Sequence, residues 1–185
     1  MRALPERQPT LTAQRVRLRP FALADARELQ RLAGDARVAL MTKHIPHPYP
    51  DGAAESFIGS LLARYDSAES ITYAIVGTDD ALRGGIALEL DSAANEAELG
   101  YWVAFEHWGQ GIATEAGGAL LEFAFDTLAL ARVQARHIVR NPASGRVMEK
   151  LGMTPVRTEH DVPWRGDARE DYVFRALTRR EWNAR

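Results

Sequence analysis

A glycine-rich turn between an apolar strand pattern and a helical pattern constrains this chain more than any other feature. The turn reads Trp108-Gly109-Gln110-Gly111-Ile112-Ala113-Thr114-Glu115. Such a junction directs several backbone N–H groups and the positive end of a helix dipole at one point, which suits a pyrophosphate. The sequence therefore predicts a site for a phosphate-bearing cofactor.

Two common phosphate-binding motifs do not match this turn. The Rossmann pattern requires Gly or Ala where Thr114 stands, and the P-loop requires a Lys-Ser/Thr pair that does not follow Gly111. The remaining pattern, x-Gly-x-Gly-x-Ala, lets a ligand lie against the main chain while the Gln110 side chain points outward. A plain strand-to-helix connection has the same short pattern, so the neighbouring segments decide.

The segments on either side of the turn have clear patterns. Upstream, residues 98–103 alternate as a strand that places Glu98, Gly100 and Trp102 on one face and the residues between them on the other. Downstream, Asn141 is a good N-cap, Pro142 suits the first helical position, and Gly152 suits the position just past the helix end.

Together these segments resemble a known family. The succession Glu-Leu-Gly-Tyr-Trp-Val, Trp-Gly-Gln-Gly-Ile-Ala-Thr-Glu-Ala, Asn-Pro-Ala-Ser and Glu-Lys-Leu-Gly-Met resembles the GNAT superfamily of acetyl-CoA-dependent N-acetyltransferases. The chain looks most like the branch with the RimJ and RimL acetylases of ribosomal-protein N-termini, from about Leu11 to Leu177. Trp108 departs from the Arg or Gln of many members, although an aromatic residue suits this branch.

The resemblance implies acetyl-CoA as acetyl donor and a set of residues that contact it. Backbone N–H groups around Val103 would stabilise the oxyanion, and amides of the glycine-rich turn would bind the pyrophosphate. The expected cofactor-binding residues are Trp102, Val103, Trp108, Gly109, Gln110, Gly111, Ile112, Ala113, Thr114, Asn141 and Ser144.

Acetylation of an amine also requires a base, because an N-terminal amine titrates near ~8 and a lysine near ~10.4. Glu98 is the predicted base, with Gly100 and Trp102 reducing its solvation and raising its pKa. An ordinary polar-face glutamate is the alternative, and Glu96, expected in an exposed turn, is the competitor. Ser144 could protonate the departing thiolate, a task that a tyrosine performs in many relatives, or could be a satisfied helical hydroxyl.

Bulk properties exclude several classes of protein. Lys and Arg total 23 against 25 Asp and Glu, so no strong field favours nucleic acid, and Arg15, Arg17 and Arg19 are interpreted as a solvated edge. Without cysteine there is no thiolate nucleophile, so the acetyl group passes directly to the acceptor or through another nucleophile. No apolar run approaches the ~20 residues of a membrane span. We expect a cytoplasmic monomer or homodimer without a metal, since His44 and His47 lack a clear third ligand.

The patterns predict a single domain at residues 11–185, after an N-terminal extension at residues 1–10. Its fold class is mixed, α+β or α/β, with a twisted, mostly antiparallel sheet of about seven strands and helices on both faces. Strands are expected at residues 16–21, 71–76, 85–90, 96–104, 132–139, 153–161 and 171–177. Helices are expected at residues 25–32, 36–41, 53–65, from 112 and from 142, with Phe57, Leu61 and Leu62 facing inward. The proline-rich loop at residues 44–52 is either a wall of the acceptor pocket or a connector.

The leading functional hypothesis is an N-acetyltransferase that moves an acetyl group from acetyl-CoA to a primary amine in a ternary complex. A protein N-terminus and a small-molecule amine are both candidate acceptors. The alternative is a non-catalytic acyl-CoA-binding sensor or interaction domain, since the cofactor site and the base are separable features. Acidic residues at the expected mouth either indicate a cationic acceptor or are only solvated, namely Asp161, Asp167, Glu170 and Asp171.

Overall fold

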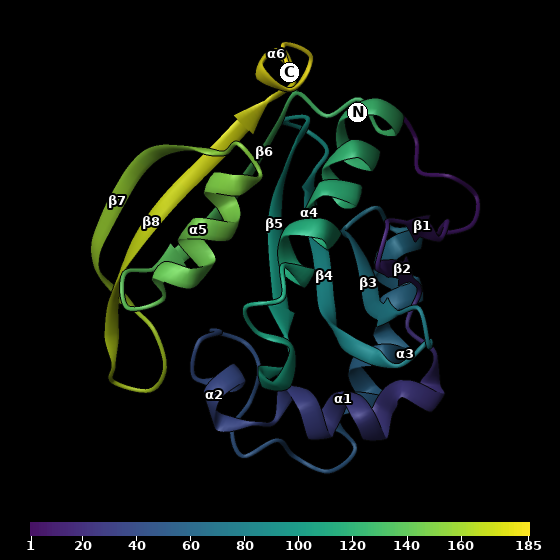
Figure 1. Ribbon diagram of the computed structural model, residues 1–185, viewed down its shortest axis with the longest axis vertical. Helices are drawn as coiled ribbons and strands as arrows, with labels where there is room; N and C mark the ends of the chain where they lie inside the picture. The colour runs from purple at the N-terminus through teal and green to yellow at the C-terminus, as the bar shows by residue number, and fades with distance from the viewer.

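Eight strands form one sheet in the computed structural model, which describes residues 1–185 (Figure 1). Their spatial order is β1-β2-β3-β4-β5-β6-β8-β7, and every neighbouring pair is antiparallel except β5 with β6. The strands are β1 (Leu11–Thr12), β2 (Val16–Arg19), β3 (Ser70–Gly77), β4 (Leu82–Asp91), β5 (Glu96–Val103), β6 (Arg132–Ile138), β7 (Thr154–Pro163) and β8 (Arg169–Thr178).

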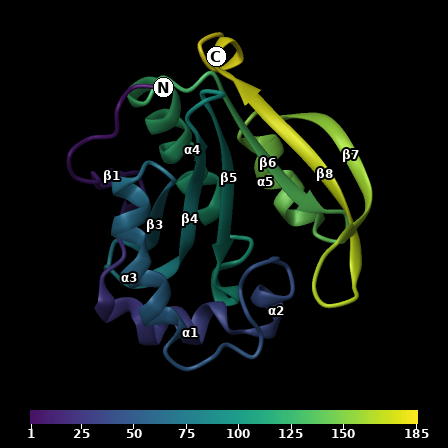
Figure 2. The same ribbon diagram turned by 180° about the vertical axis from the view of Figure 1, so that it is seen from behind.

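Helices cover both faces of this sheet. In Figure 1, α4 lies in front of the central strands and α5 beside β6, whereas the reverse view in Figure 2 has α3 in front of β3. The helices are α1 (Ala26–Ala33), α2 (Ala36–Ala39), α3 (Ala53–Asp66), α4 (Ile112–Glu122), α5 (Pro142–Lys150) and α6 (Arg179–Trp182). Short 3-10 turns occupy Leu23–Asp25 and Phe105–His107, and a π-helical turn at Phe123–Thr127 extends α4.

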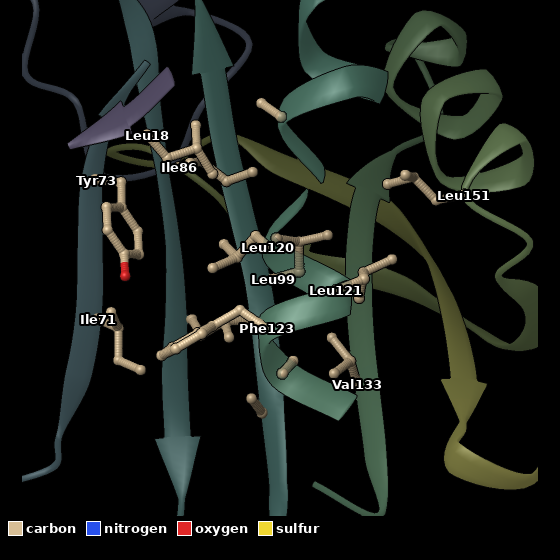
Figure 3. Packing of buried hydrophobic residues seen from close by; sticks show 14 of the residues in the cluster. Leu18, Ile71, Tyr73, Ile86, Leu99, Leu120, Leu121, Phe123, Val133 and Leu151 are labelled. Atoms are coloured by element: carbon tan, nitrogen blue, oxygen red, sulfur yellow. The ribbon is translucent and has the colours of Figure 1, made fainter. Parts of the chain in front are cut away.

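The main core lies between α4 and the central strands. Side chains that alternate along β3, β4 and β5 meet one face of α4, as Ile71, Ile86, Leu99, Leu120 and Leu121 show in Figure 3. All five are at most 2% exposed. A second cluster on the opposite face packs α1 and α3 against the sheet. One face of β5 therefore packs toward α4, and the other packs toward α1 and α3.

Strands β5 and β6 separate after a short parallel contact. Residues 96–98 of β5 pair with residues 132–134 of β6, and no later residues of the two strands pair. Beyond that point β5 continues along β4 to Val103, while β6 continues along β8 to Ile138. The sheet is consequently open between β5 and β6.

The fold predicted from the sequence is confirmed in class, and it differs in detail. The sheet has an eighth strand, the two-residue β1, and four of the seven expected strands are longer than expected while three are shorter. The predicted inward face of α3 is wrong for Phe57 and Leu62, which are 37% and 70% exposed, whereas Leu61 is half-buried. The buried side chains are instead Ala54, Ile58 and Tyr65, which follow the helical period from an alanine that the pattern overlooked.

The first ten residues are packed against the domain. The backbone N–H of Arg2 donates to the Leu128 carbonyl at 2.7 Å, and the Gln8 side-chain amide donates to the Thr72 carbonyl at 2.9 Å. The Tyr65 hydroxyl also donates to the Pro5 carbonyl at 2.7 Å. Across the chain, none of the helices has the length and apolar character to cross a membrane.

Candidate active site

A cavity of about 520 Å³ occupies the opening between β5 and β6 and extends onto both faces of the sheet. From the face covered by α4 and α5, Tyr101, Val103, the glycine-rich turn and Ser144 line it. From the face covered by α1 and α3, Glu98, Gly100 and Trp102 line it. Alternation along β5 thus divides the cavity into two halves that meet at this strand.

The glycine-rich turn lines the first half of the cavity with backbone groups that could hold an anion. Gly109 and Gly111 have φ of 76° and 80°, a left-handed conformation that disfavours other residues. Helix α4 begins at Ile112 without a side-chain cap, so the N–H groups of its first turn are free for a ligand. Six of the predicted cofactor residues in this segment line the cavity, namely Trp108, Gly109, Gly111, Ile112, Ala113 and Thr114.

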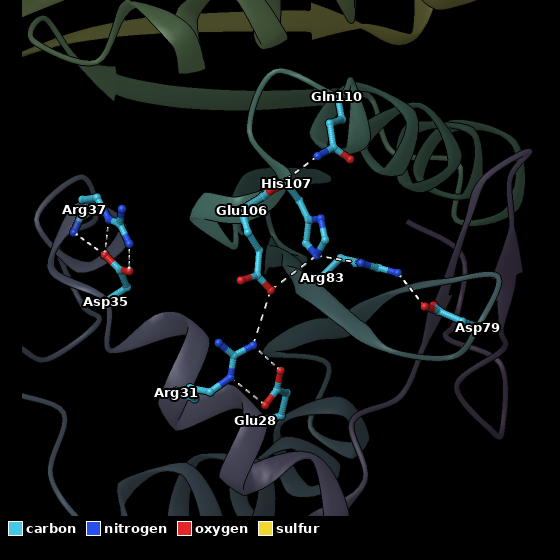
Figure 4. Close-up of polar contacts among 9 residues, drawn as sticks. All are labelled: Glu28, Arg31, Asp35, Arg37, Asp79, Arg83, Glu106, His107 and Gln110. Atoms are coloured by element: carbon cyan, nitrogen blue, oxygen red, sulfur yellow. Dashed lines mark hydrogen bonds and ion pairs between the residues drawn. The ribbon is translucent and has the colours of Figure 1, made fainter.

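Gln110 does not line the cavity, and its side chain is part of the support beneath the turn. Its amide donates to the Glu106 carbonyl at 3.0 Å (Figure 4). From the other side Arg15 donates to the Gln110 carbonyl at 2.9 Å and pairs with Glu115 at 2.7 Å. Arg15, interpreted from the sequence as part of a solvated edge, therefore anchors the turn to the start of α4.

An ionic network holds the segment that leads into this turn (Figure 4). Arg83 donates to His107 Nε2 at 2.7 Å and pairs with Asp79 at 2.7 Å. Glu106 accepts from Arg31 of α1 at 3.4 Å. Burial and the Arg83 charge lower the pKa of His107, so the imidazole remains neutral and accepts the Arg83 hydrogen bond.

On α5, Asn141 and Ser144 are placed as a helix start, as predicted. The Asn141 Oδ1 atom accepts from the Ser144 N–H at 3.2 Å, and both residues line the cavity. Ser144 Oγ lies 2.9 Å from the Tyr101 hydroxyl, which also donates to the Ser144 carbonyl at 3.0 Å. Burial raises the pKa of Tyr101 to about 12, so this hydroxyl keeps its proton at neutral pH.

Glu98 lies in the second half of the cavity beside a cation. Its Oε1 atom is 3.0 Å from Arg136 Nε, and its Oε2 atom accepts from the Gln134 amide at 3.3 Å. The expected apolar surroundings are therefore replaced on one side by Arg136. Its competitor Glu96 is not in a turn: it begins β5 and pairs with Arg132 at 2.7 Å, outside the cavity.

Two cations of α5 that the sequence analysis did not single out also line the cavity. Arg146 and Lys150 are four residues apart, so they share a helix face, and neither forms an ion pair within the chain. The sequence could have indicated both residues, because they follow Asn-Pro-Ala-Ser at helical spacing.

The loop after α2 walls the second half of the cavity through Lys43, His44 and Ile45. Arg165, from the β7–β8 turn, donates to the carbonyls of Ala39 at 2.8 Å and Thr42 at 2.9 Å, and also to that of Ile45. Arg165 therefore links this loop to the β7–β8 hairpin through hydrogen bonds.

Three of the four acidic residues expected at the mouth pair with basic side chains, and Asp167 forms no ion pair. Asp161 pairs with Arg169 at 2.7 Å, and Asp171 pairs with His160 at 2.8 Å. Glu170 pairs with Arg140. Nowhere in the chain do three His, Asp or Glu side chains gather into a set that could hold a metal ion.

Known proteins share both this sequence pattern and this fold. The family description "Acetyltransferase (GNAT) domain" matches residues 15–154, more than half of the chain. "Putative ribosomal N-acetyltransferase YdaF" of Bacillus subtilis is 37% identical over 105 residues, which are 56% of this chain and 57% of that protein. The chain thus spans little more than half the length of this curated relative.

Two solved structures have the same fold. RimJ of Mycobacterium smegmatis in complex with CoA-disulfide gives a TM-score of 0.83 at 23% identity, covering 94% of this chain and 89% of that one. The Microcin C7 self immunity acetyltransferase MccE in complex with acetyl-CoA and AMP gives 0.81 at 20% identity, covering 89% and 93%.

Proposed function

The chain belongs to the GNAT family of acetyl-CoA-dependent acyltransferases, and from that premise we propose that it acetylates a primary amine directly, with both substrates bound at once. The acceptor amine enters the Glu98 half of the cavity, and acetyl-CoA occupies the half beside α4 and α5. The arrangement of β5 carries this proposal. On this one strand Glu98 offers a carboxylate to one half of the cavity, and Tyr101 offers a hydroxyl to the other.

The residues of the α4 and α5 half suit acetyl-CoA. Free N–H groups at the start of α4 and glycines without side chains leave room for a pyrophosphate. Arg146 and Lys150 add positive charge for its phosphates, and Asn141 and Val103 line the path toward β5. The bound donor supplies the acetyl group as an activated thioester.

Glu98 is the proposed base, and Tyr101 with Ser144 the proposed acid. The carboxylate accepts the proton of the incoming ammonium group, directly or through water. The Tyr101 hydroxyl, 2.9 Å from Ser144 Oγ, donates a proton toward the departing sulfur on the opposite face. N–H groups near Val103, beyond the point where β6 leaves β5, are the proposed donors to the carbonyl oxygen.

Release of CoA thiol with a panel of amines tests the reaction, and the chain has no cysteine to add background. Glu98→Gln preserves shape and should lower kcat by roughly 10²–10⁴ at neutral pH. Acetyl-CoA affinity should stay unchanged, and the deficit should shrink as pH nears the acceptor's own pKa.

Glu96→Gln is the matched control, since it removes a carboxylate from the same strand outside the cavity. If both variants keep activity within about threefold of the unmutated protein, Glu98 is not the base. Binding of acetyl-CoA without acetylation of any amine would favour the non-catalytic sensor.

A further inference from the structure

The half of the cavity that receives the acceptor has a flat floor across three strands. Thr72 of β3 pairs with Ala87 of β4, and Ala87 pairs with Gly100 of β5. Directly opposed residues share one face, and all three line the cavity. With strands about 4.8 Å apart, this row of small residues spans about 10 Å.

Aromatic side chains bound this floor on one side. A Cβ built on Gly85 would lie 2.7 Å from Trp102 Nε1 and 3.4 Å from Phe21 Cζ, so both rings reach over Gly85. Phe57 of α3 meets Phe21 edge to face, with centroids 6.0 Å apart. Phe57 is 37% exposed and lines the cavity, which places an apolar ring where a ligand would cover it.

The other side of the floor carries charges that are already paired. Glu89 and Glu98 oppose each other across β4 and β5. Arg64 holds Glu89 at 2.8 Å, and Arg136 holds Glu98 at 3.0 Å. A polycationic acceptor would require unpaired carboxylates here. Of the acids near the β7–β8 hairpin only Asp167 is unpaired, and it lies outside the cavity.

A further polar group faces neither water nor protein. Tyr172 of β8 is 3% exposed and lines the cavity, and its hydroxyl has no hydrogen-bond partner. This oxygen is buried beneath the cavity surface, so it gives no information about the ligand. The row of small residues, the aromatic border and the pairing of both carboxylates favour a compact, largely apolar ligand.

We propose that the acceptor is a small primary monoamine with a flat aromatic body, which lies on Thr72, Ala87 and Gly100 with its nitrogen at Glu98. This inference rests on the proposed acetyltransferase function and names the substrate class of that site. Trp102 and Phe21 border the aromatic body, since ring pairs prefer offset or edge-to-face contact.

The test compares 2-phenylethylamine, spermidine and a short peptide with an N-terminal alanine, by CoA release at one pH. We expect kcat/KM for 2-phenylethylamine to exceed that for the other two at least tenfold. The variant Gly100→Val places two methyl groups on the floor. No atom lies within 4 Å of a Cβ at Gly100, and valine suits a strand, so the fold should be kept.

Gly100→Val should raise KM for 2-phenylethylamine at least tenfold and leave acetyl-CoA affinity unchanged. Gly59→Val is the control, because a Cβ there also meets nothing within 4 Å but Gly59 lies outside the cavity. Preference for spermidine or the peptide, or full activity of Gly100→Val, would overturn the proposal while leaving the acetyltransferase function intact. Failure of every amine would overturn both.

Discussion

Tyr101 illustrates how a single residue acquires a role from its neighbours. Its hydroxyl contacts both Ser144 Oγ and the Ser144 carbonyl, and its raised pKa keeps it protonated between pH 7 and 9. Tyr101→Phe should lower kcat by about 10², the lower range for a general acid, without weakening CoA binding. Ser144→Ala should cost less, because Tyr101 keeps its carbonyl partner. Steady-state kinetics with calorimetric CoA affinities measure both, and a larger loss in Ser144→Ala would reverse the assignment.

The sequence predicted the faces of Glu98 and Tyr101 but not the role of Tyr101. Strand alternation placed Tyr101 with the core residues Leu99 and Val103, and this is correct locally. Its ring reaches the cavity because β6 leaves β5 after residue 98, which depends on pairing between distant segments. Arg136, the partner of Glu98, comes from that distant strand, so this ion pair could not be predicted from local sequence either.

Arg165 connects two elements that wall the acceptor half, and its replacement should affect one substrate only. Arg165→Met keeps the chain length but loses the donors to the carbonyls of loop 39–45. We expect KM for the acceptor to rise about tenfold, the equivalent of roughly 1.4 kcal/mol, with unchanged acetyl-CoA affinity. Arg169→Met is the control, since Arg169 pairs only within its own hairpin. If both variants raise the KM for the acceptor equally, the contact of Arg165 with the loop is not what positions the acceptor.

The segment Phe105–His107 should make stability depend on pH through His107. Folded His107 has a lowered pKa, whereas in the unfolded chain it binds a proton near 6.5. The unfolded state therefore holds more protons below about pH 6.5, and stability falls as pH decreases through this window. The charges that face His107 are those of Arg83, Asp79, Glu106 and Arg31.

His107→Gln keeps an acceptor for Arg83 but does not titrate. Its Tm should fall less than that of the unmutated protein between pH 7.5 and 5.5, as differential scanning fluorimetry would measure. His44, whose pKa is also lowered by burial, contributes equally in both proteins. Parallel Tm curves would show that His107 is not responsible.

Local patterns predicted most elements, and tertiary contacts decided the remainder. Helix α5 begins and ends as expected. Asn141 and Pro142 stand at its start, and Gly152, with φ of 76°, follows its end. Gly117 within α4 is explained by a tertiary contact. A Cβ at Gly117 would lie 2.7 Å from Leu151, so at this position α4 packs closely against the end of α5. Nothing in the structure explains Gly118.

The molecule as a whole is built around an opening in its sheet, so ligand binding should be visible in global stability. Acetyl-CoA in the proposed half would contact the start of α4, α5 and β5 together. The unfolded chain offers no such site. A ligand bound only by the native state stabilises it by RT ln(1 + [L]/Kd), about 2.7 kcal/mol at a hundredfold excess over Kd.

For a domain of this size, that free energy corresponds to a Tm increase on the order of 5 °C. Acetyl-CoA and CoA should both produce it in a thermal melt, whereas NADH and ATP should do less, because neither carries a pantetheine arm for the opening beside Val103. The variant Arg146→Gln should reduce the CoA shift and leave the unliganded Tm unchanged, since Arg146 is exposed and forms no ion pair within the chain. A melting curve moved by ATP but not by millimolar CoA would contradict the placement of the donor in this half of the cavity.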